Sequence, residues 1–100
     1  MTRQGVDLDP QGRCAHYRSP RDIALNRCGT CGDYFACHRC HDELTDHVFG
    51  RVDKRDPEAV ECGICGHRMG YNEYSTAPGC AGCGHEFNPG CAAHAHLYWA

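Results

Sequence analysis

Cysteine and histidine gather in one stretch of the chain, "CGTCGDYFACHRCHDELTDH" at residues 28–47. These twenty positions hold four cysteines and three histidines. Thiolates and imidazoles at this density could form a redox site, a disulfide framework, a metal cluster or an active site. The spacing of the remaining cysteines helps to separate these four kinds of chemistry.

Eight of the ten cysteines fall in C-x-x-C pairs, which are Cys28/Cys31, Cys37/Cys40, Cys62/Cys65 and Cys80/Cys83. A disulfide within such a pair would close a tiny loop and would constrain the unfolded chain very little. Two thiolates at this spacing can instead bind a single tetrahedral zinc ion. One pair alone would also fit a dithiol redox protein, but four pairs together favour zinc.

Glycine follows the second cysteine in three of these pairs, at Gly32, Gly66 and Gly84. The residue at this point of a zinc knuckle often needs a positive φ, which glycine adopts without steric cost. Two of the knuckles also share the longer pattern C-x-x-C-G-x-x-F, through duplication or through convergence. Aligning them places Cys91 and His94 where the first copy has its next cysteine pair.

The composition leaves little material for a conventional core. The 41% hydrophobic fraction includes ten cysteines and ten alanines among 100 residues, and domains this small usually need disulfides or metals. Residues 1–13 lack the apolar region of a signal peptide, and no run approaches the roughly 18 apolar residues of a membrane span. We therefore expect a cytoplasmic protein with reduced thiols and no membrane association.

The expected fold is a small metal-stabilised domain of zinc knuckles with short β-hairpins and one or two short helices. Residues 1–13 read as a flexible arm, and residues 22–28 as a short strand. A helix is expected over residues 41–49, with Leu44 and Val48 on one face. Residues 51–61 form a charged joint, residues 67–76 a hairpin or loop, and residues 90–100 one or two helical turns.

The motif "CAHY" at residues 14–17, followed by the ordered cysteine pairs and by "CAAHAHLYW" at residues 91–99, resembles the CHY-type zinc finger. That family occurs at the N-terminus of certain eukaryotic RING ubiquitin ligases. It also occurs as small single-domain proteins, including a helper of the small Tim proteins. The chain is similar to the stand-alone form, because it ends where a ligase would continue into further zinc domains.

The resemblance implies three zinc ions and a division of the ligands among them. The implied sets are Cys14, His16, Cys37 and Cys40; Cys28, Cys31, His41 and His47; and Cys62, Cys65, Cys80 and Cys83. Residues 14–50 would then form an interleaved two-zinc module, and residues 62–100 a zinc-ribbon-like module with a C-terminal Cys/His turn. Spacing alone does not make this division unique.

Cys91 and His94 remain after twelve ligands have been assigned. They could belong to a fourth zinc site completed by His85, His96 or another protein, or they could form a reactive pair. Alternatively, Cys91 is a small buried apolar residue and His94 a packed aromatic one. The sequence leaves these alternatives open.

Charge and ligand number limit the function. The net charge is −3, and the nine arginines and one lysine lie among 13 acidic residues, whereas zinc modules that bind nucleic acid do so with a basic face. Nucleic acid is therefore not an expected partner. A catalytic zinc keeps an open position for water, whereas each cluster here fills with four ligands, so we do not expect an enzyme.

Two classes of function remain. The first is a structural protein-interaction module with an unidentified protein partner, and its exposed candidates are Tyr71, Tyr74, Tyr98 and Trp99, although these are expected to pack against the knuckles. The second is a thiol–zinc redox or zinc-transfer helper that acts on cysteine-rich client proteins. The sequence does not indicate an oligomeric state.

Overall fold

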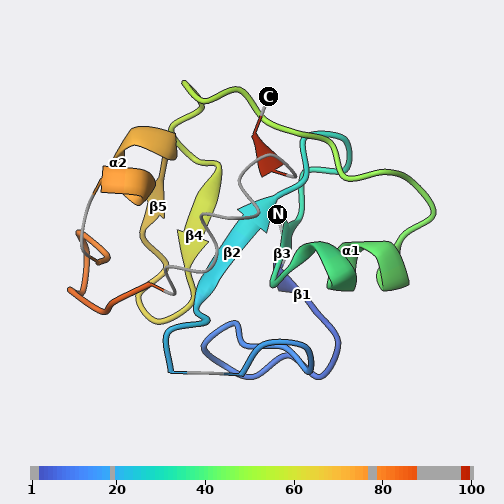
Figure 1. The fold of residues 1–100 in the computed structure, drawn as a ribbon, viewed down its shortest axis with the longest axis horizontal. Helices are drawn as coiled ribbons and strands as arrows, with labels where there is room; N and C mark the ends of the chain where they lie inside the picture. The colour runs from blue at the N-terminus through green and yellow to red at the C-terminus, as the bar shows by residue number, and fades with distance from the viewer. Residues whose placement is uncertain (1–2, 19, 77–78, 88–97, 100) are drawn as a thin grey trace.

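A five-stranded sheet lies at the centre of the molecule (Figure 1). The computed structural model describes residues 3–18, 20–76, 79–87 and 98–99. The strand order is β1-β3-β2-β4-β5, and the strands are β1 (Arg3–Gln4), β2 (Ala24–Arg27), β3 (Tyr34–Phe35), β4 (Val60–Cys62) and β5 (Arg68–Met69). The described residues also form two short helices, α1 (His38–Leu44) and α2 (Tyr71–Thr76). Short knuckles and hairpins with two short helices are the fold class that the sequence predicts.

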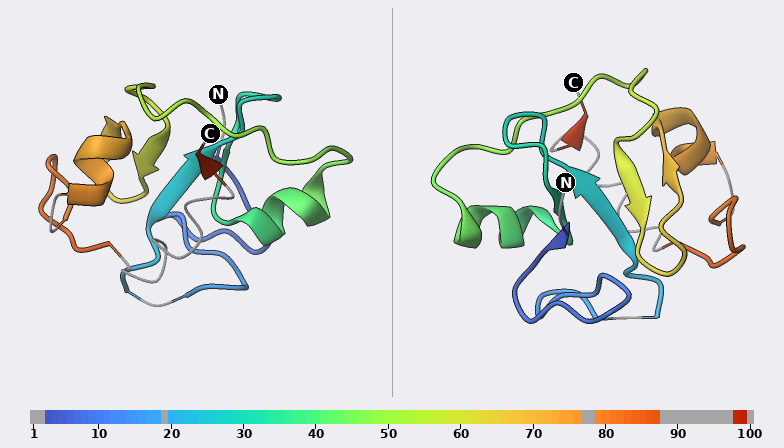
Figure 2. Two further views of the ribbon diagram at one scale, coloured as in Figure 1. Left: turned by 45° about the horizontal axis from the view of Figure 1, so that its top comes forward. Right: turned by 180° about the vertical axis from the view of Figure 1, so that it is seen from behind.

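The longest strand, β2, lies within the predicted strand at residues 22–28 and joins the two ends of the sheet. It pairs antiparallel with β3 through Asn26 and Arg27, and antiparallel with β4 over Ala24–Asn26. The two helices lie at opposite edges of the sheet: α1 lies near β1 and β3, and α2 lies near β5 (Figure 2). Among the described residues, no helix is long and apolar enough to cross a membrane.

One face of the sheet carries the small apolar core. Because side chains alternate along a strand, the pairing register places Ala24, Val60, Cys62 and Met69 on the same face. They pack in one cluster with their sequence neighbours Ile23 and Ala59 and with residues from other parts of the chain, which are Val52, Cys80, Tyr98 and Trp99. Tyr98 and Trp99, two candidate surface aromatics for which packing is expected, are therefore buried.

The opposite face carries a row of charged side chains that neutralise one another. Glu61 is largely buried on β4, and its carboxylate lies 3.2 Å from Nε of Arg3 and 3.7 Å from Nε of Arg68. Arg27 forms an ion pair with Asp56. The Glu61 pairs connect β4 to β1 and β5, and the Arg27 pair connects β2 to the loop before β4. A buried carboxylate such as that of Glu61 must be paired to remain charged.

Helix α1 begins three residues before the predicted start and ends five residues before the predicted end at residue 49. Cys37 is its N-cap, because its sulfur accepts a hydrogen bond from the backbone N–H of Cys40 at 3.4 Å. Thr45 ends the helix in an extended conformation, which turns the chain so that His47 returns toward His41. Leu44 and Val48 therefore do not share a buried face, and both are exposed.

Residues 67–76, predicted as a hairpin or loop, form one strand of a hairpin and a helix that was not predicted: β5 pairs antiparallel with β4, and α2 follows directly. Tyr71 on α2 packs edge-to-face on Trp99, with ring centroids 5.2 Å apart. Tyr74 packs in the same way on Phe87 at 5.1 Å. These two tyrosines therefore lie against the core, as the sequence predicts.

The predicted division into arm, module, joint and module differs from this arrangement. Residues 3 and 4 of the predicted arm form β1, which pairs in parallel with β3. Arg3 also donates hydrogen bonds to the carbonyls of Cys62 and Gly63 at 3.2 and 3.0 Å. Val60 and Glu61 of the predicted joint belong to β4, so one sheet spans both zinc-rich segments. Short polar strands of two residues carry too little hydrophobic pattern to be recognised from sequence.

Candidate metal centres

The structure brings twelve cysteines and histidines into three groups of four. Within each group the potential ligand atoms all lie within 4.8 Å of one another. The groups are group 1 (Cys14, His16, Cys37, Cys40), group 2 (Cys28, Cys31, His41, His47) and group 3 (Cys62, Cys65, Cys80, Cys83). The division is the one that the family resemblance implies. Cys91 and His94, the proposed remainder, lie outside the described residues.

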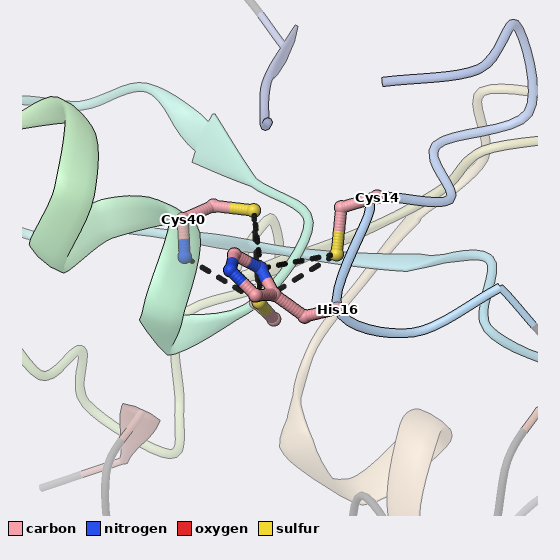
Figure 3. A group of neighbouring side chains, drawn as sticks. Cys14, His16 and Cys40 are labelled. Carbon is pink, nitrogen blue, oxygen red and sulfur yellow. Dashed lines mark hydrogen bonds between the residues drawn. The ribbon is translucent and has the colours of Figure 1, made fainter. Parts of the chain in front are cut away.

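Group 1 joins the loop at residues 14–17 to the start of α1. Hydrogen bonds from the N–H of Cys14 to the carbonyl of Tyr17 (3.3 Å) and from the N–H of Ala15 to that of Val6 (2.8 Å) shape this loop. Figure 3 shows the sulfurs of Cys14 and Cys40 and the ring of His16 directed toward one another. Its three cysteines are buried beside Val6, Tyr17 and Ala36, so water has little access to the sulfurs.

Distances within group 1 match a tetrahedral zinc site. Nδ1 of His16 lies 3.8, 3.4 and 3.5 Å from the sulfurs of Cys14, Cys37 and Cys40. The sulfur of Cys37 lies 3.7 Å from that of Cys14 and 3.6 Å from that of Cys40. Zinc bonds of about 2.3 Å to sulfur and about 2.0 Å to nitrogen place neighbouring ligand atoms roughly 3.3–3.8 Å apart in a tetrahedron. The residues present therefore fit zinc.

The sulfurs of group 1 also need a cation. A hydrogen bond with Cys37 lowers the pKa of Cys14 to about 4, whereas the same bond and burial raise the pKa of Cys37. One thiolate is therefore stabilised at the expense of its neighbour. A dication that binds all three sulfurs removes this conflict, because a metal-bound thiol is deprotonated outright.

Group 2 combines the first knuckle with α1 and the loop after it. The Nε2 atoms of His41 and His47 lie 3.1 Å apart, and Nε2 of His47 lies 3.6 Å from the sulfur of Cys28. Although burial opposes it, hydrogen bonds from the N–H groups of Cys31 and Gly50 lower the pKa of Cys28 to about 6. The buried Cys28 is thus prepared as a thiolate ligand.

Thr45 holds the two histidines of group 2 in position. Its hydroxyl donates to the carbonyl of His41 at 2.7 Å and to the carbonyl of His47 at 3.3 Å, and it lies 3.3 Å from Nδ1 of His41. The sequence interpretation did not identify this residue. Its position in the sequence could have indicated this role, because a threonine at a helix end between two ligand histidines is well placed to bond to nearby carbonyls.

Group 3 is built from two knuckles that face each other. The sulfur of Cys62 lies 3.8 Å from that of Cys83, and the sulfur of Cys65 lies 3.6 Å from that of Cys80. Cys62 and Cys80 are buried, whereas Cys65 and Cys83 are exposed. Burial raises the pKa of Cys62 to about 12, so four thiolates are not compatible here without a bound cation.

Three knuckles share one backbone geometry, as the glycine pattern predicts. In each, the glycine after the second cysteine donates to the carbonyl of the first cysteine at 2.7–2.9 Å, and the first cysteine donates to the carbonyl five residues later at 2.8–3.0 Å. The φ angles of Gly32, Gly66 and Gly84 are 83°, 79° and 78°, which confirms the predicted positive φ. The pair Cys37/Cys40 differs because it begins α1.

Each group offers four ligand atoms, all of them cysteine sulfurs or imidazole nitrogens. Four ligands of these two kinds are typical of structural zinc sites. The CHY zinc finger family matches residues 14–90. The chain belongs to the CHY zinc finger family. This CHY zinc finger therefore contains three groups positioned to bind zinc, and three zinc ions are expected.

Curated relatives cover nearly the whole CHY zinc finger. The "Helper of Tim protein 13" of Saccharomyces cerevisiae is 38% identical over 95% of this chain and 87% of its own length, and that of Kluyveromyces lactis is 37% identical over 95% and 85%. An uncharacterised protein of Schizosaccharomyces pombe is 40% identical over 95% and 86%. No solved structure matches the chain. Family and relatives together indicate a zinc-binding protein.

Proposed function

We propose that the protein is a structural protein-interaction module whose surface is held in shape by zinc. The observation that carries this proposal is that each of the three groups supplies four protein ligands. Structural zinc sites are closed in this way, whereas catalytic sites keep one position for water or substrate. We therefore propose no enzymatic activity.

The surface proposed for binding is the α1 ridge, defined here as the exposed residues Asp42, Leu44, Asp46 and Val48. Within the described ranges, Leu44 (48% exposed) and Val48 (87% exposed) are the large apolar side chains that stay at the surface. The group 2 ligands His41 and His47 lie beside them in the sequence, so zinc would fix the shape of the ridge. Two aliphatic side chains among carboxylates favour a partner segment that is both apolar and positively charged.

Nucleic acid is not a proposed partner. Arg3, Arg27 and Arg68 are the arginines of the charged sheet face, and each faces a carboxylate of this chain. This pairing supports the expectation drawn from the net charge, because phosphate binding requires available basic groups. We also keep the cytoplasm as the proposed location, since a reducing compartment preserves thiolates as zinc ligands.

A small Tim protein is the first partner to test, because two relatives are named as helpers of a Tim protein. Binding of the zinc-loaded chain to a small Tim protein should be measured by calorimetry for the wild type and the double variant Leu44→Ser/Val48→Ser. The variant should bind at least tenfold more weakly while keeping its zinc. Ser75→Ala, an exposed change on α2, is the matched control. Equal affinity of the double variant and the wild type would show that the α1 ridge is not the binding surface.

Transfer of zinc to a cysteine-rich client is the second candidate function. The exposure of Cys65 and Cys83 favours it, because a client thiol could reach these sulfurs in group 3. Four thiolates and one Zn²⁺ leave a net charge of −2 on this group, which makes its sulfurs nucleophilic. As zinc leaves, the thiolates of group 3 would take up protons, and the client thiols would lose the same number on binding the ion.

The two candidates differ in where zinc is found after mixing. A reduced small Tim protein and the zinc-loaded chain should be combined and examined by native mass spectrometry. A module would form a complex in which this chain keeps its zinc. Transfer would instead leave a client that has gained one zinc ion and a chain that has lost one from group 3, with Cys65 and Cys83 newly open to alkylation.

A further inference from the structure

The two ring nitrogens of His16 have different neighbours. Nδ1 faces the three sulfurs of group 1 at 3.4–3.8 Å. Nε2 points the other way and lies 3.0 Å from the carboxylate oxygen Oε2 of Glu43 on α1. The His16 side chain is only 16% exposed, whereas that of Glu43 is 55% exposed. The ring therefore bridges the metal group and a surface carboxylate.

We infer that Glu43 is a positioning residue that makes His16 an Nδ1 ligand. An ionised carboxylate only accepts hydrogen bonds, so the proton of a neutral imidazole must reside on Nε2 for this contact to form. The lone pair of Nδ1 is then directed toward the sulfurs. A carboxylate bonded to the far nitrogen fixes the ring and raises its basicity as a ligand.

This contact also gives α1 control of group 1. The helix already supplies the sulfur of Cys40 and, at its N-cap, the sulfur of Cys37. Glu43 adds the group that orients the fourth ligand, which comes from the loop at residues 14–17. The geometry of group 1 thus depends on one helix of seven residues as well as on the loop. The inference concerns the metal site and stands independently of the proposed partner.

Asp46 provides an internal comparison. Its carboxylate lies 3.7 Å from Nδ1 of His47, a ligand of group 2, and its side chain is fully exposed. A distance of 3.7 Å is too long for a hydrogen bond, and solvent screens the charge. Asp46 should therefore not orient its histidine, although it too is an acidic residue beside a ligand.

The test compares Glu43→Ala and Glu43→Gln with Asp46→Asn and with Asp42→Asn, a change at the exposed acid next to Glu43. Co²⁺ substitution reports each group separately, because its absorption bands depend on the number of thiolate ligands. Affinity is measured by competition with a chromophoric chelator. Glu43→Ala should weaken binding at group 1 by roughly tenfold or more, and Glu43→Gln by less, since an amide oxygen still accepts the hydrogen bond. Both control variants should bind Co²⁺ at group 1 with the affinity of the wild type.

Long-range ¹H–¹⁵N NMR spectra of the zinc-loaded protein give a second readout that does not depend on affinity. They should show the proton of His16 on Nε2 and the metal on Nδ1. Metal on Nε2 would overturn the inference, as would unchanged affinity in Glu43→Ala. Equal losses at all three groups, or the same loss in Asp42→Asn, would show that Glu43 contributes only to general stability or charge and would also overturn it.

Discussion

Cys40 and His41 are consecutive residues of α1, yet their side chains belong to different metal groups. The sulfur of Cys40 lies 3.5 Å from Nδ1 of His16 in group 1, and Nε2 of His41 lies 3.1 Å from that of His47 in group 2. The helix has seven residues, too few to be stable alone in water. Zinc at either group should therefore stabilise the helix on which the other depends.

Substitution of one ligand on the shared helix should consequently affect both groups. Cys40→Ala should abolish zinc binding at group 1 and weaken it at group 2 by about tenfold, a coupling within the range of 1–3 kcal/mol typical between linked sites. Native mass spectrometry during chelator titration would measure this. Cys83→Ala in group 3 is the control and should leave both groups of α1 loaded. An unchanged affinity of group 2 in Cys40→Ala would show that the helix does not couple them.

The knuckle glycines should be required for backbone conformation rather than for space. A Cβ atom added at Gly66 would meet nothing within 4 Å, but φ there is +79°. Gly66→Ala should lower the free energy of unfolding by about 1 kcal/mol, measured in urea at a fixed excess of zinc. Gly66→Asn should cost less, because asparagine tolerates this conformation. A loss in Gly66→Asn as large as that in Gly66→Ala would contradict the conformational explanation.

Zinc affinity should depend on pH more steeply at group 3 than at group 2. In the unfolded, metal-free chain, thiols titrate near pH 8.5 and imidazoles near pH 6.5. Between pH 7 and 8, folding around zinc therefore displaces up to about four protons from group 3 but about two from group 2. Binding depresses the pKa of the ligand thiols. Its contribution to stability is therefore full above about pH 8.5 and is lost as the pH falls. Chelator competition at pH 7 and pH 8 would measure the zinc affinity of each group. An equal change of affinity with pH at groups 2 and 3 would contradict this prediction.

Thiol reagents should distinguish the cysteines by exposure. In the zinc-loaded protein, alkylation should reach Cys65 and Cys83 before Cys14, Cys37 and Cys40, which are buried. Mass spectrometry of peptides after short labelling would give the order. Labelling of the group 1 sulfurs at the same rate as those of group 3 would show that group 1 opens readily, in conflict with its burial.

Residue type and spacing were sufficient to predict the local chemistry. C-x-x-C followed by glycine defines a turn through short-range geometry alone, so the positive φ at Gly32 and Gly84 could be predicted. The same holds for the strand that leads into the first knuckle, because Ile23 and Leu25 alternate with shorter residues. Local signals of this kind require no knowledge of the tertiary structure.

Long-range contacts could not be predicted in the same way. Strand β1 pairs in parallel with β3, and the side chain of its Arg3 donates hydrogen bonds to residues about 60 positions away. The end of α1 is set by the return of His47 to group 2, which overrides the apolar spacing of Leu44 and Val48. Glu43 is an ordinary helix residue in the sequence, and only the folded arrangement places it beside the ligand histidine His16.

The central claim is that three zinc ions take the place of a larger hydrophobic core. Native mass spectrometry during stepwise chelation tests it directly, since one spectrum gives both the number of zinc ions and the charge states that report compactness. The reduced protein should begin with the three described groups filled and should shift to the charge states of an unfolded chain as zinc is removed. A compact protein after complete loss of zinc, or fewer than three zinc ions at the start, would contradict the claim.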